Sequence, residues 1–289
     1  NFKFQHIEII GRTHNDDVLE TLKAVIKLLH SLNLDISLEE NTASALDLTQ
    51  YNTIEKSQLG KSSDLVIVVG GDGSLLSAAR IAAQYDTPVL GINRGNLGFL
   101  SDIAPSELED KLLNVLQGDY ITEERFMLTA TAEGNTHFAL NEVALMAANT
   151  PHLICFDIYV DDKLVCNQRA DGIIIATPTG STAYALSGGG PILHPELNAI
   201  VLVPMFPHTL SMRPIVINAD RKITLQVAGN YKTQMQLSCD SQNSLPVIDN
   251  SKIEINKHHK ALKLIQPTTH DYYESLRSKL HWAKKLAKQ

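Results

Sequence analysis

The chain has 289 residues, of which 44% are hydrophobic and 20% are charged, and its formal net charge at pH 7 is −7. This length favours two domains, and the composition is that of an ordinary globular protein with a sizeable core. The negative charge argues against nucleic-acid binding as the main function, and no apolar run approaches the ~20 residues of a membrane span.

The first hundred residues alternate strand-like and helix-like patterns. The strand-like runs are HIEII (6–10), DISLEE (35–40), LVIVV (65–69) and PVLGIN (88–93). Residues 65–69 are apolar throughout, which is typical of a parallel strand buried on both faces. Asn15 provides an N-cap for a helix with apolar residues from Leu19 to Leu29, and a second helix is predicted over 74–84. This alternation predicts a parallel α/β sheet.

A linking helix is predicted next, with Ser106 as the N-cap of a capping box, Glu109 as its partner and Gly118 at its end. From about 122 to 265, short strand-like runs alternate with turn residues, which predicts a β-sandwich or a related all-β domain. Within it, Asp161-Asp162 is expected to form a hairpin turn.

The remaining histidines, cysteines and apolar residues give weaker signals. His258-His259 lies in a polar stretch and is expected on the surface of a hairpin. Leu276, Leu280, Ala283 and Ala287 predict a last amphipathic helix. The three cysteines are odd in number and match no metal motif, so we expect free thiols in a reducing cytoplasm.

The stretch Gly70-Gly71-Asp72-Gly73 follows the buried run 65–69 and precedes the predicted second helix. Glycines let backbone N–H groups approach a phosphate, and a helix N-terminus at the carboxyl end of a strand favours an anionic ligand. Asp72 can take a proton from an attacking hydroxyl or hold Mg²⁺. A tight turn without catalytic function is the alternative on these residues alone.

Two further stretches lie in the second half. TPTGSTAYALSGGGP (177–191) mixes glycine, proline and hydroxyl residues, so it is either a ligand-binding loop or a structural connection. In HFALNEVALMA (137–147), strand alternation places Glu142 on an apolar face, where an unpaired carboxylate is costly. Either the strand ends or bulges at Asn141-Glu142, or Glu142 meets donors such as two ribose hydroxyls. An edge strand with Glu142 in water is the alternative.

Three polar stretches identify no function alone. In NQRADG (167–172), Asp171 either pairs with Arg169 or accepts hydrogen bonds from an adenine amino group or an amide. PHTLSMRP (207–214) and CDSQ (239–242) are polar breaks in apolar surroundings.

Together these stretches resemble the NAD kinase family in its bacterial form. The matching runs are GGDGS (70–74), INRGNLGFL (92–100), NEV (141–143), DGIIIATPTGSTAYALSGGGPI (171–192), PHTLSMRP (207–214) and CDSQ (239–242). GGDG also occurs in diacylglycerol-kinase-like and phosphofructokinase-like enzymes, whereas TPTGSTAY and the NE pair are more specific. The resemblance implies phosphoryl transfer from ATP, or from polyphosphate in some members, to the 2′-hydroxyl of the adenosine ribose of NAD. The products are NADP and ADP, and the expected cofactor is a divalent metal cation, Mg²⁺.

The resemblance also implies the architecture. A Rossmann-like α/β domain of the phosphofructokinase and diacylglycerol-kinase kind is expected over 1–103, and a β-sandwich that binds NAD over 104–270. A C-terminal helix over 271–289 is expected to pack back on the α/β domain. Expected partners are NAD, ATP and further copies of the chain in a dimer or tetramer, with neither nucleic acid nor a membrane.

By the motif match, Asp72 is expected to be the catalytic base, with Gly73 beside it at the phosphates. The expected NAD contacts are Asn141, Glu142, His152, Arg169, Asp171, Thr182, Ala183, Tyr184, Ala185, Leu186, Ser187 and Gln242. The chain departs from relatives at Ser77, where some carry a basic residue, and at Ser241, where many carry glycine. The first departure puts the binding of the phosphoryl donor in doubt.

Two other functions are weighed against this one. A lipid kinase can use the same GGDG turn, but it needs an apolar acceptor cleft. A non-catalytic module would bind NAD and form no NADP.

Overall fold

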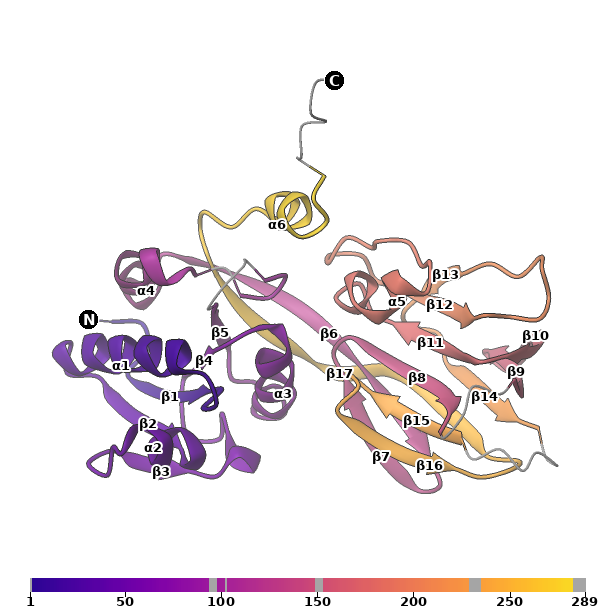
Figure 1. The fold of residues 1–289 in the computed structure, drawn as a ribbon, viewed down its shortest axis with the longest axis horizontal. Helices are drawn as coiled ribbons and strands as arrows, with labels where there is room; N and C mark the ends of the chain where they lie inside the picture. Colours follow the sequence, from indigo (N-terminus) through magenta and orange to yellow (C-terminus); the bar gives the residue numbers. More distant parts are fainter. Residues whose placement is uncertain (1, 94–97, 102, 149–152, 229–234, 283–289) are drawn as a thin grey trace. The chain divides into compact units, whose positions relative to one another are not determined.

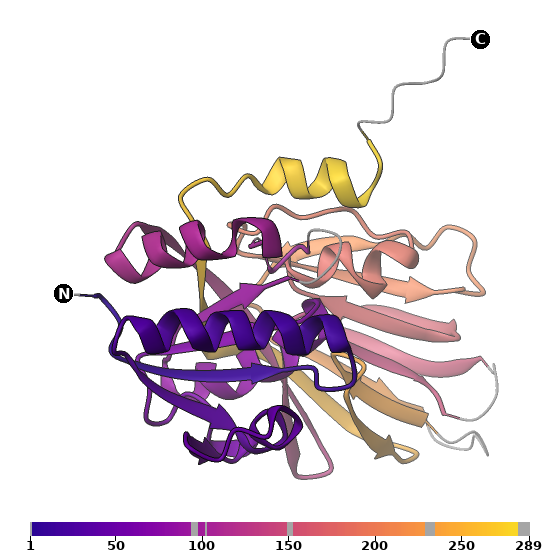
Figure 2. The same cartoon turned by 60° about the vertical axis from the view of Figure 1, so that its left-hand side comes forward.

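A computed structural model describes residues 2–93, 98–101, 103–148, 153–228 and 235–282 (Figures 1 and 2). The chain forms two compact units: unit 1 comprises Asn1–Glu124 and Leu262–Gln289, and unit 2 comprises Arg125–Ala261. The domain boundaries expected at 103 and 270 stay predictions. Within the described ranges, no helix has both the length and the apolar character needed to cross a membrane.

Unit 1 contains a parallel α/β sheet. Its elements are β1 (His6–Gly11), α1 (Asp16–Ser31), β2 (Asp35–Glu39), α2 (Glu40–Leu46), β3 (Asn52–Ile54), η1 (Lys56–Gln58), β4 (Leu65–Val69), α3 (Asp72–Ala82), η2 (Ala83–Tyr85), β5 (Val89–Ile92), η3 (Pro105–Glu107), α4 (Leu108–Gln117) and α6 (Tyr272–Lys279). The strand order is β5-β4-β1-β2-β3, and the end of β17 (Lys252–Pro267) adds beside β5 through Leu264 and Ile265. The predicted parallel sheet is therefore confirmed.

Strand β4 lies in the interior of this sheet, and all of its residues are buried. Leu65, Ile67 and Val69 join the core formed with α1 and α4, whereas Val66 and Val68 are buried outside that cluster. Burial on both faces explains why the run 65–69 is apolar without alternation. The sheet thus fixes the end of β4, from which the GGDG stretch emerges.

The predicted helix ends are partly correct. Asn15 caps α1 by accepting a hydrogen bond from the Asp17 N–H at 2.9 Å, and Gly118 ends α4 with a φ of +99°. The capping box at Ser106 was a wrong prediction, because the 3₁₀ turn η3 begins at Pro105 and contains Ser106. Helix α4 consequently starts one residue later, at Leu108, with Glu107 at the N-cap and no side-chain cap.

Unit 2 is a sandwich of two sheets, as the sequence predicted. Its strands are β6 (Tyr120–Ala132), β7 (Asn135–Ala139), β8 (Glu142–Ala147), β9 (Ile154–Val160), β10 (Lys163–Ala170), β11 (Gly172–Ala176), β12 (Ala199–Met205), β13 (Ile215–Asn218), β14 (Ile223–Val227), β15 (Met235–Cys239), β16 (Asn243–Val247) and most of β17. One sheet contains β10-β9-β14-β17 with β6 and β7, and the other has the order β13-β12-β11-β8-β15-β16. Apolar residues of both sheets share one core. The hairpin turn at Asp161-Asp162 is confirmed, with φ values of +48° and +63°.

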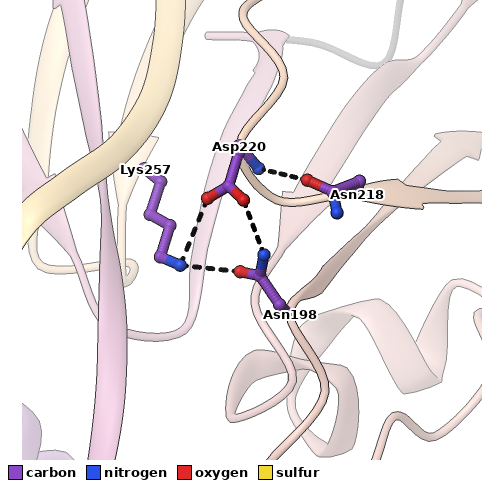
Figure 3. A network of polar contacts seen from close by, with 4 residues as sticks. All are labelled: Asn198, Asn218, Asp220 and Lys257. Atoms are coloured by element: carbon purple, nitrogen blue, oxygen red, sulfur yellow. Dashed lines mark hydrogen bonds and ion pairs between the residues drawn. The ribbon is translucent and has the colours of Figure 1, made fainter.

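A polar network lies on β17 in this unit (Figure 3). The Lys257 ammonium group donates to Asn198 Oδ1 at 2.6 Å and to Asp220 Oδ1 at 3.3 Å, and Asn198 donates to Asp220 Oδ2 at 2.7 Å. The hydrogen bonds from Asn198 and then Lys257 lower the pKa of Asp220. Because Asn198 and Asp220 flank β12 and β13, the network joins the two sheets. Its side chains are exposed, so its net contribution to stability is small.

Helix α6 is shorter than the helix expected over 271–289. Asp271 caps it by accepting from the Tyr273 N–H at 2.8 Å, and Leu276 is buried as predicted. Ala283 and Ala287 lie outside the described residues.

The expected exposed position of His258 was wrong. Strand β17 continues through this position without a turn, and His258 is only 7% exposed. Its Nδ1 lies 3.0 Å from Thr129 Oγ1, and its ring centroid lies 4.6 Å from that of Phe138. Burial, followed by the charges of His259 and Lys260, lowers the pKa of His258 below its usual value of 6.5.

This burial predicts a pH dependence of stability. Between pH 6.5 and the lower folded-state pKa, the unfolded chain binds a proton at His258 that the folded chain does not, so stability falls as pH decreases through this range. We expect the free energy of unfolding, measured by urea titration at pH 7.5 and 5.5, to fall less in His258→Gln than in the wild type. The exposed His14, changed to Gln, is the matched control and should retain the wild-type dependence. Equal pH dependence in all three proteins would contradict the prediction.

Candidate active site

Asp72 is the first residue of α3 and follows the carboxyl end of β4. Its carboxylate accepts hydrogen bonds from the backbone N–H groups of Phe99, at 3.0 Å, and Leu100, at 3.3 Å. Both residues lie beyond β5, the strand next to β4 in the sheet. The Asp72 side chain thus joins the segments that follow two neighbouring parallel strands, at the edge where open α/β sheets bind ligands.

The backbone conformation requires glycine at only one of the three glycine positions in the GGDG stretch. Gly70 has a φ of +156°, and a Cβ there would lie 3.0 Å from Ser74 Oγ. A Cβ on Gly71 or Gly73 would meet nothing within 4 Å, and neither residue has a positive φ. A tight turn therefore explains Gly70 but leaves Gly71 and Gly73 unexplained. Exposed backbone without a Cβ is what close approach of a phosphate requires.

Arg12 also lies at this edge of the sheet. Its N–H donates to the Val69 carbonyl at 3.3 Å, and its Cβ lies 3.9 Å from the position of a Cβ on Gly70. The side chain is exposed, and among the described residues it has no ion-pair partner. Arg12 could not be assigned to this site from the sequence, because only the parallel pairing of β1 with β4 brings it beside the GGDG stretch.

In unit 2, the peptide groups around Asn141 lie in a break between two strands. Strand β7 ends at Ala139 and β8 begins at Glu142. The Asn141 N–H donates to Asp240 Oδ1 at 2.7 Å. The Asn141 carbonyl accepts from the Thr177 N–H at 2.9 Å and from Thr177 Oγ1 at 3.2 Å. The break is thus held by hydrogen bonds from two other segments of the chain.

The loop that follows β11 packs directly against this break. Gly180 lies so close to Asn141 that a Cβ on Gly180 would collide with the Asn141 carbonyl group. The Gly180 N–H donates to Thr177 Oγ1 at 3.1 Å, and Ser181 Oγ accepts from the Leu193 N–H at 2.9 Å. The glycine in TPTGSTAY is therefore required by close packing against the NE pair.

Glu142 is buried, with 3% of its surface exposed, so the edge-strand alternative was wrong. Its Oε2 atom has no hydrogen-bond partner among the residues that the structure describes. Burial first, and then the charge of Asp240, raises the pKa of Glu142 to about 7. The strand break expected at this position is confirmed, yet it does not expose the carboxylate to solvent. A buried oxygen without a donor is costly, which makes Glu142 ready to accept hydrogen bonds from a ligand.

The structure divides the other predicted residues between the two ends of β11. At the end near Glu142 lie Thr182 in the 3₁₀ helix η4 (Gly180–Thr182) and Gln242 in the turn after β15. Arg169 and Asp171 precede the opposite end of β11, where Gly172 pairs with Met146. Glu142 lies opposite Ala176, five residues from Asp171, so at about 3.3 Å per residue Asp171 and Glu142 are roughly 17 Å apart.

A short helix lies between these two groups. Ala183 precedes α5 (Tyr184–Ser187), which holds the predicted residues Tyr184, Ala185, Leu186 and Ser187. The Tyr184 hydroxyl lies 3.5 Å from Met146 Sδ, so this side chain packs along the sheet. His152 lies outside the described residues. Among the residues that the structure does describe, no three His, Cys, Asp or Glu side chains gather as a metal site.

The residues that hold the Asn141 break could not be identified from the sequence either. Thr177, Gly180 and Asp240 all lie in the stretches 177–191 and 239–242, but their contacts depend on β11 and β15 flanking β8. The available signal was the Asp240-Ser241 pair between two strand-like runs, which is a hairpin-turn pattern.

Models of protein families match both halves of the chain. The ATP-NAD kinase N-terminal domain matches residues 7–120, and the ATP-NAD kinase C-terminal domain matches residues 140–267. The NAD kinase of Coxiella burnetii (strain Dugway 5J108-111) is 49% identical over 290 residues, covering 99% of this chain and 97% of that protein. The NAD kinase of Pseudomonas entomophila (strain L48) is 48% identical over 289 residues, with 98% of each covered.

Solved structures show the same fold. A yeast NADH kinase complexed with NADH has a TM-score of 0.90 and 24% identity, covering 99% of this chain and 90% of that one. An NAD kinase from Archaeoglobus fulgidus in complex with ATP has a TM-score of 0.75 and 25% identity, covering 96% of this chain and 98% of that one. At 24% identity, the likeness to the yeast enzyme shows a shared fold alone.

Proposed function

This chain belongs to the NAD kinase family, whose members use ATP to phosphorylate the 2′-hydroxyl of the adenosine ribose of NAD, and from that premise we propose which residues hold the two substrates. Asn141 and Glu142 bind the adenosine ribose. The observation that supports this most is the Glu142 carboxylate, which is 3% exposed and has an oxygen without a hydrogen-bond partner. Two neighbouring ribose hydroxyls can both donate hydrogen bonds to one carboxylate.

The remaining NAD contacts are proposed by position. Thr182 and Gln242 lie at the Glu142 end of β11, and Asp171 and Arg169 lie at the other end. The segment from Ala183 to Ser187 follows Thr182, and its Tyr184 hydroxyl reaches Met146, the residue that pairs with Gly172 at the other end. His152 is proposed from the resemblance alone. NAD is long enough for contacts at both ends of such a strand.

The phosphoryl donor is proposed to bind at the start of α3. Exposed backbone at Gly71 and Gly73 allows a phosphate to approach, and the helix N-terminus favours its charge. Arg12 provides a cation beside this stretch, where the P-loop lysine is missing and Ser77 replaces a basic residue of some relatives. A magnesium ion would neutralise charge on the phosphates. It would be held mainly by the phosphates and by at most Asp72, because the described residues contain no cluster of metal ligands.

Asp72 is proposed as the general base. It takes the proton of the 2′-hydroxyl as that oxygen bonds to the terminal phosphorus of ATP, and the bond to the departing ADP breaks. Among the described residues, each Asp72 oxygen accepts one backbone N–H, and a carboxylate oxygen has a second lone-pair site that can accept the hydroxyl. The loop 98–100 thus fixes the carboxylate without saturating it.

We also propose a homo-oligomer in the cytoplasm. The three cysteines, Cys155, Cys166 and Cys239, form no disulfide among the described residues, which supports a reducing compartment. Phe206, Leu210 and Val216 are exposed apolar side chains of unit 2, and Phe206 and Leu210 line a cavity of about 320 Å³. Apolar surface of this kind is commonly covered by another subunit.

Gly73→Ala tests whether the glycine at this position is required for phosphate binding and not for folding. Alanine favours a helix over glycine by about 1 kcal/mol, so we expect an unchanged or higher melting temperature. The added methyl group should nevertheless raise the KM for ATP at least tenfold, because it blocks the approach of a phosphate. Asn114→Ala, on the exposed face of α4, is the control and should alter stability without altering the KM. An unchanged KM for ATP in Gly73→Ala would contradict the proposal that the phosphoryl donor binds at this stretch.

Asp72→Asn tests the base. General-base catalysis contributes about 10²–10⁴-fold, so we expect a loss of that size in kcat at saturating NAD and ATP. The amide has one acceptor for the two N–H groups of Phe99 and Leu100, so a modest decrease in melting temperature is also expected. A kcat within threefold of the wild type would exclude the base role.

Glu142→Gln tests the ribose contact. Hydrogen bonds to a charged group contribute about 1.5–3 kcal/mol, so the KM for NAD should rise roughly 10–100-fold while the KM for ATP changes little. Folding should not suffer. Because burial raises the Glu142 pKa from 4.5 to about 7, its ionisation in this range lowers stability as pH rises, and glutamine removes that cost. An unchanged KM for NAD would contradict the assignment.

A further inference from the structure

Asp240 lies in the turn between β15 and β16 and is 4% exposed. Its Oδ2 accepts from the Leu140 N–H at 2.9 Å, and its Oδ1 accepts from the N–H groups of Asn141, at 2.7 Å, and Glu142, at 3.2 Å. In return, the Asp240 N–H donates to the Glu142 carbonyl at 3.0 Å. One buried carboxylate therefore pairs with three successive N–H groups at the break between β7 and β8.

The backbone at Asp240 is strained to allow this. Asp240 and Ser241 have φ values of +53° and +55°, and the Gln242 N–H donates to the Cys239 carbonyl at 3.1 Å. This is the pattern of a type I′ turn, which favours Asn-Gly because both central residues have positive φ. A non-glycine pair in this conformation costs free energy, and strain of this kind is often found at functional sites. The strained turn is what directs the Asp240 carboxylate at the break.

We propose that Asp240 is a positioning residue for the NAD ribose: it holds the backbone of residues 140–142 so that the side chains of Asn141 and Glu142 face the ribose in one geometry. This inference rests on the ribose-binding role proposed for Asn141 and Glu142. Asp240 acts through these residues and does not itself contact NAD. A Glu142 side chain on a loosely held break would find the ribose hydroxyls in only a fraction of its conformations.

The charge of Asp240 gives the proposal a second readout. Glu142 pairs with Ala176 on β11, and its carbonyl accepts a hydrogen bond from the Asp240 N–H. Among the described residues, Asp240 is the charged group that acts on the Glu142 carboxylate. After burial, this charge is the second cause of the raised Glu142 pKa, which is about 7. If ribose binding needs the ionised carboxylate, kcat/KM for NAD should fall as pH decreases below about 7 in the wild type. Removing the Asp240 charge should move this fall to lower pH.

The test is Asp240→Asn, a change that keeps the size of the side chain. Its single acceptor oxygen cannot serve all three N–H groups, and its amide N–H₂ group repels those it faces. We expect the KM for NAD to rise roughly tenfold, the KM for ATP to stay within twofold, and the kcat/KM profile for NAD to shift to lower pH. A purely structural role would lower the melting temperature without shifting the pH profile.

Asp161→Asn is the matched control. Asp161 begins the β9–β10 turn with a φ of +48°, and its Oδ1 accepts from the Lys222 N–H at 3.1 Å. The same chemical change there should leave both KM values and the pH profile as in the wild type. If Asp240→Asn folds poorly, the substitution is repeated in a Ser241→Gly background, because glycine readily adopts the φ of +55°.

Glu142→Gln, alone and combined with Asp240→Asn, separates the positioning role of Asp240 from the ribose contact of Glu142 on which it rests. If Glu142→Gln raises the KM for NAD and Asp240→Asn adds little to it, Asp240 acts through Glu142 as proposed. If Glu142→Gln raises the KM but Asp240→Asn has wild-type KM and pH profile, the positioning role is overturned while the ribose contact stands. If Glu142→Gln leaves the KM unchanged, the ribose contact itself is wrong, and the positioning role is overturned with it.

Discussion

The candidate site of unit 2 depends on how the chain is held at Asn141. Its N–H pairs with Asp240, and its carbonyl pairs with the backbone and side chain of Thr177. Gly180 lets the loop after β11 lie directly on this peptide group. Because these contacts come from two separate segments, the turn after β15 and the loop after β11, the break in the strand is held in place from both. Glu142 can therefore be buried at a fixed position although its Oε2 has no hydrogen-bond partner in the described part of the chain.

Both halves of the chain show features that stability alone does not explain. Glu142 carries an unpaired buried oxygen, and Asp240 adopts a left-handed conformation beside it. In unit 1, Gly71 and Gly73 are retained where a Cβ would meet nothing within 4 Å. Each feature costs free energy or forgoes helix propensity in the isolated protein. Sites that bind a ligand are where such costs are expected, because the ligand supplies the missing contacts.

Local patterns predicted much of this structure. The apolar run of β4, the Asn15 cap, the hairpin turn at Asp161 and the sandwich of short strands could all be read from neighbouring residues. Contacts between distant segments could not. Asp240 and Asn141 are 99 positions apart, and their hydrogen bond depends on β15 pairing with β8. His258 was misplaced for a related reason, since its polar neighbours resembled a turn, whereas β17 continues through them.

NADP formation is the measurement that tests the assigned function most directly. The purified chain would be incubated with NAD and Mg-ATP, and NADP would be detected with an NADP-specific dehydrogenase and its 2′-phosphate located by ³¹P NMR. We expect NADP to accumulate only when both substrates are present, and diacylglycerol to give no phosphorylated product with labelled ATP. Tight NAD binding by calorimetry without any NADP would contradict the function and identify the chain as a non-catalytic NAD-binding protein.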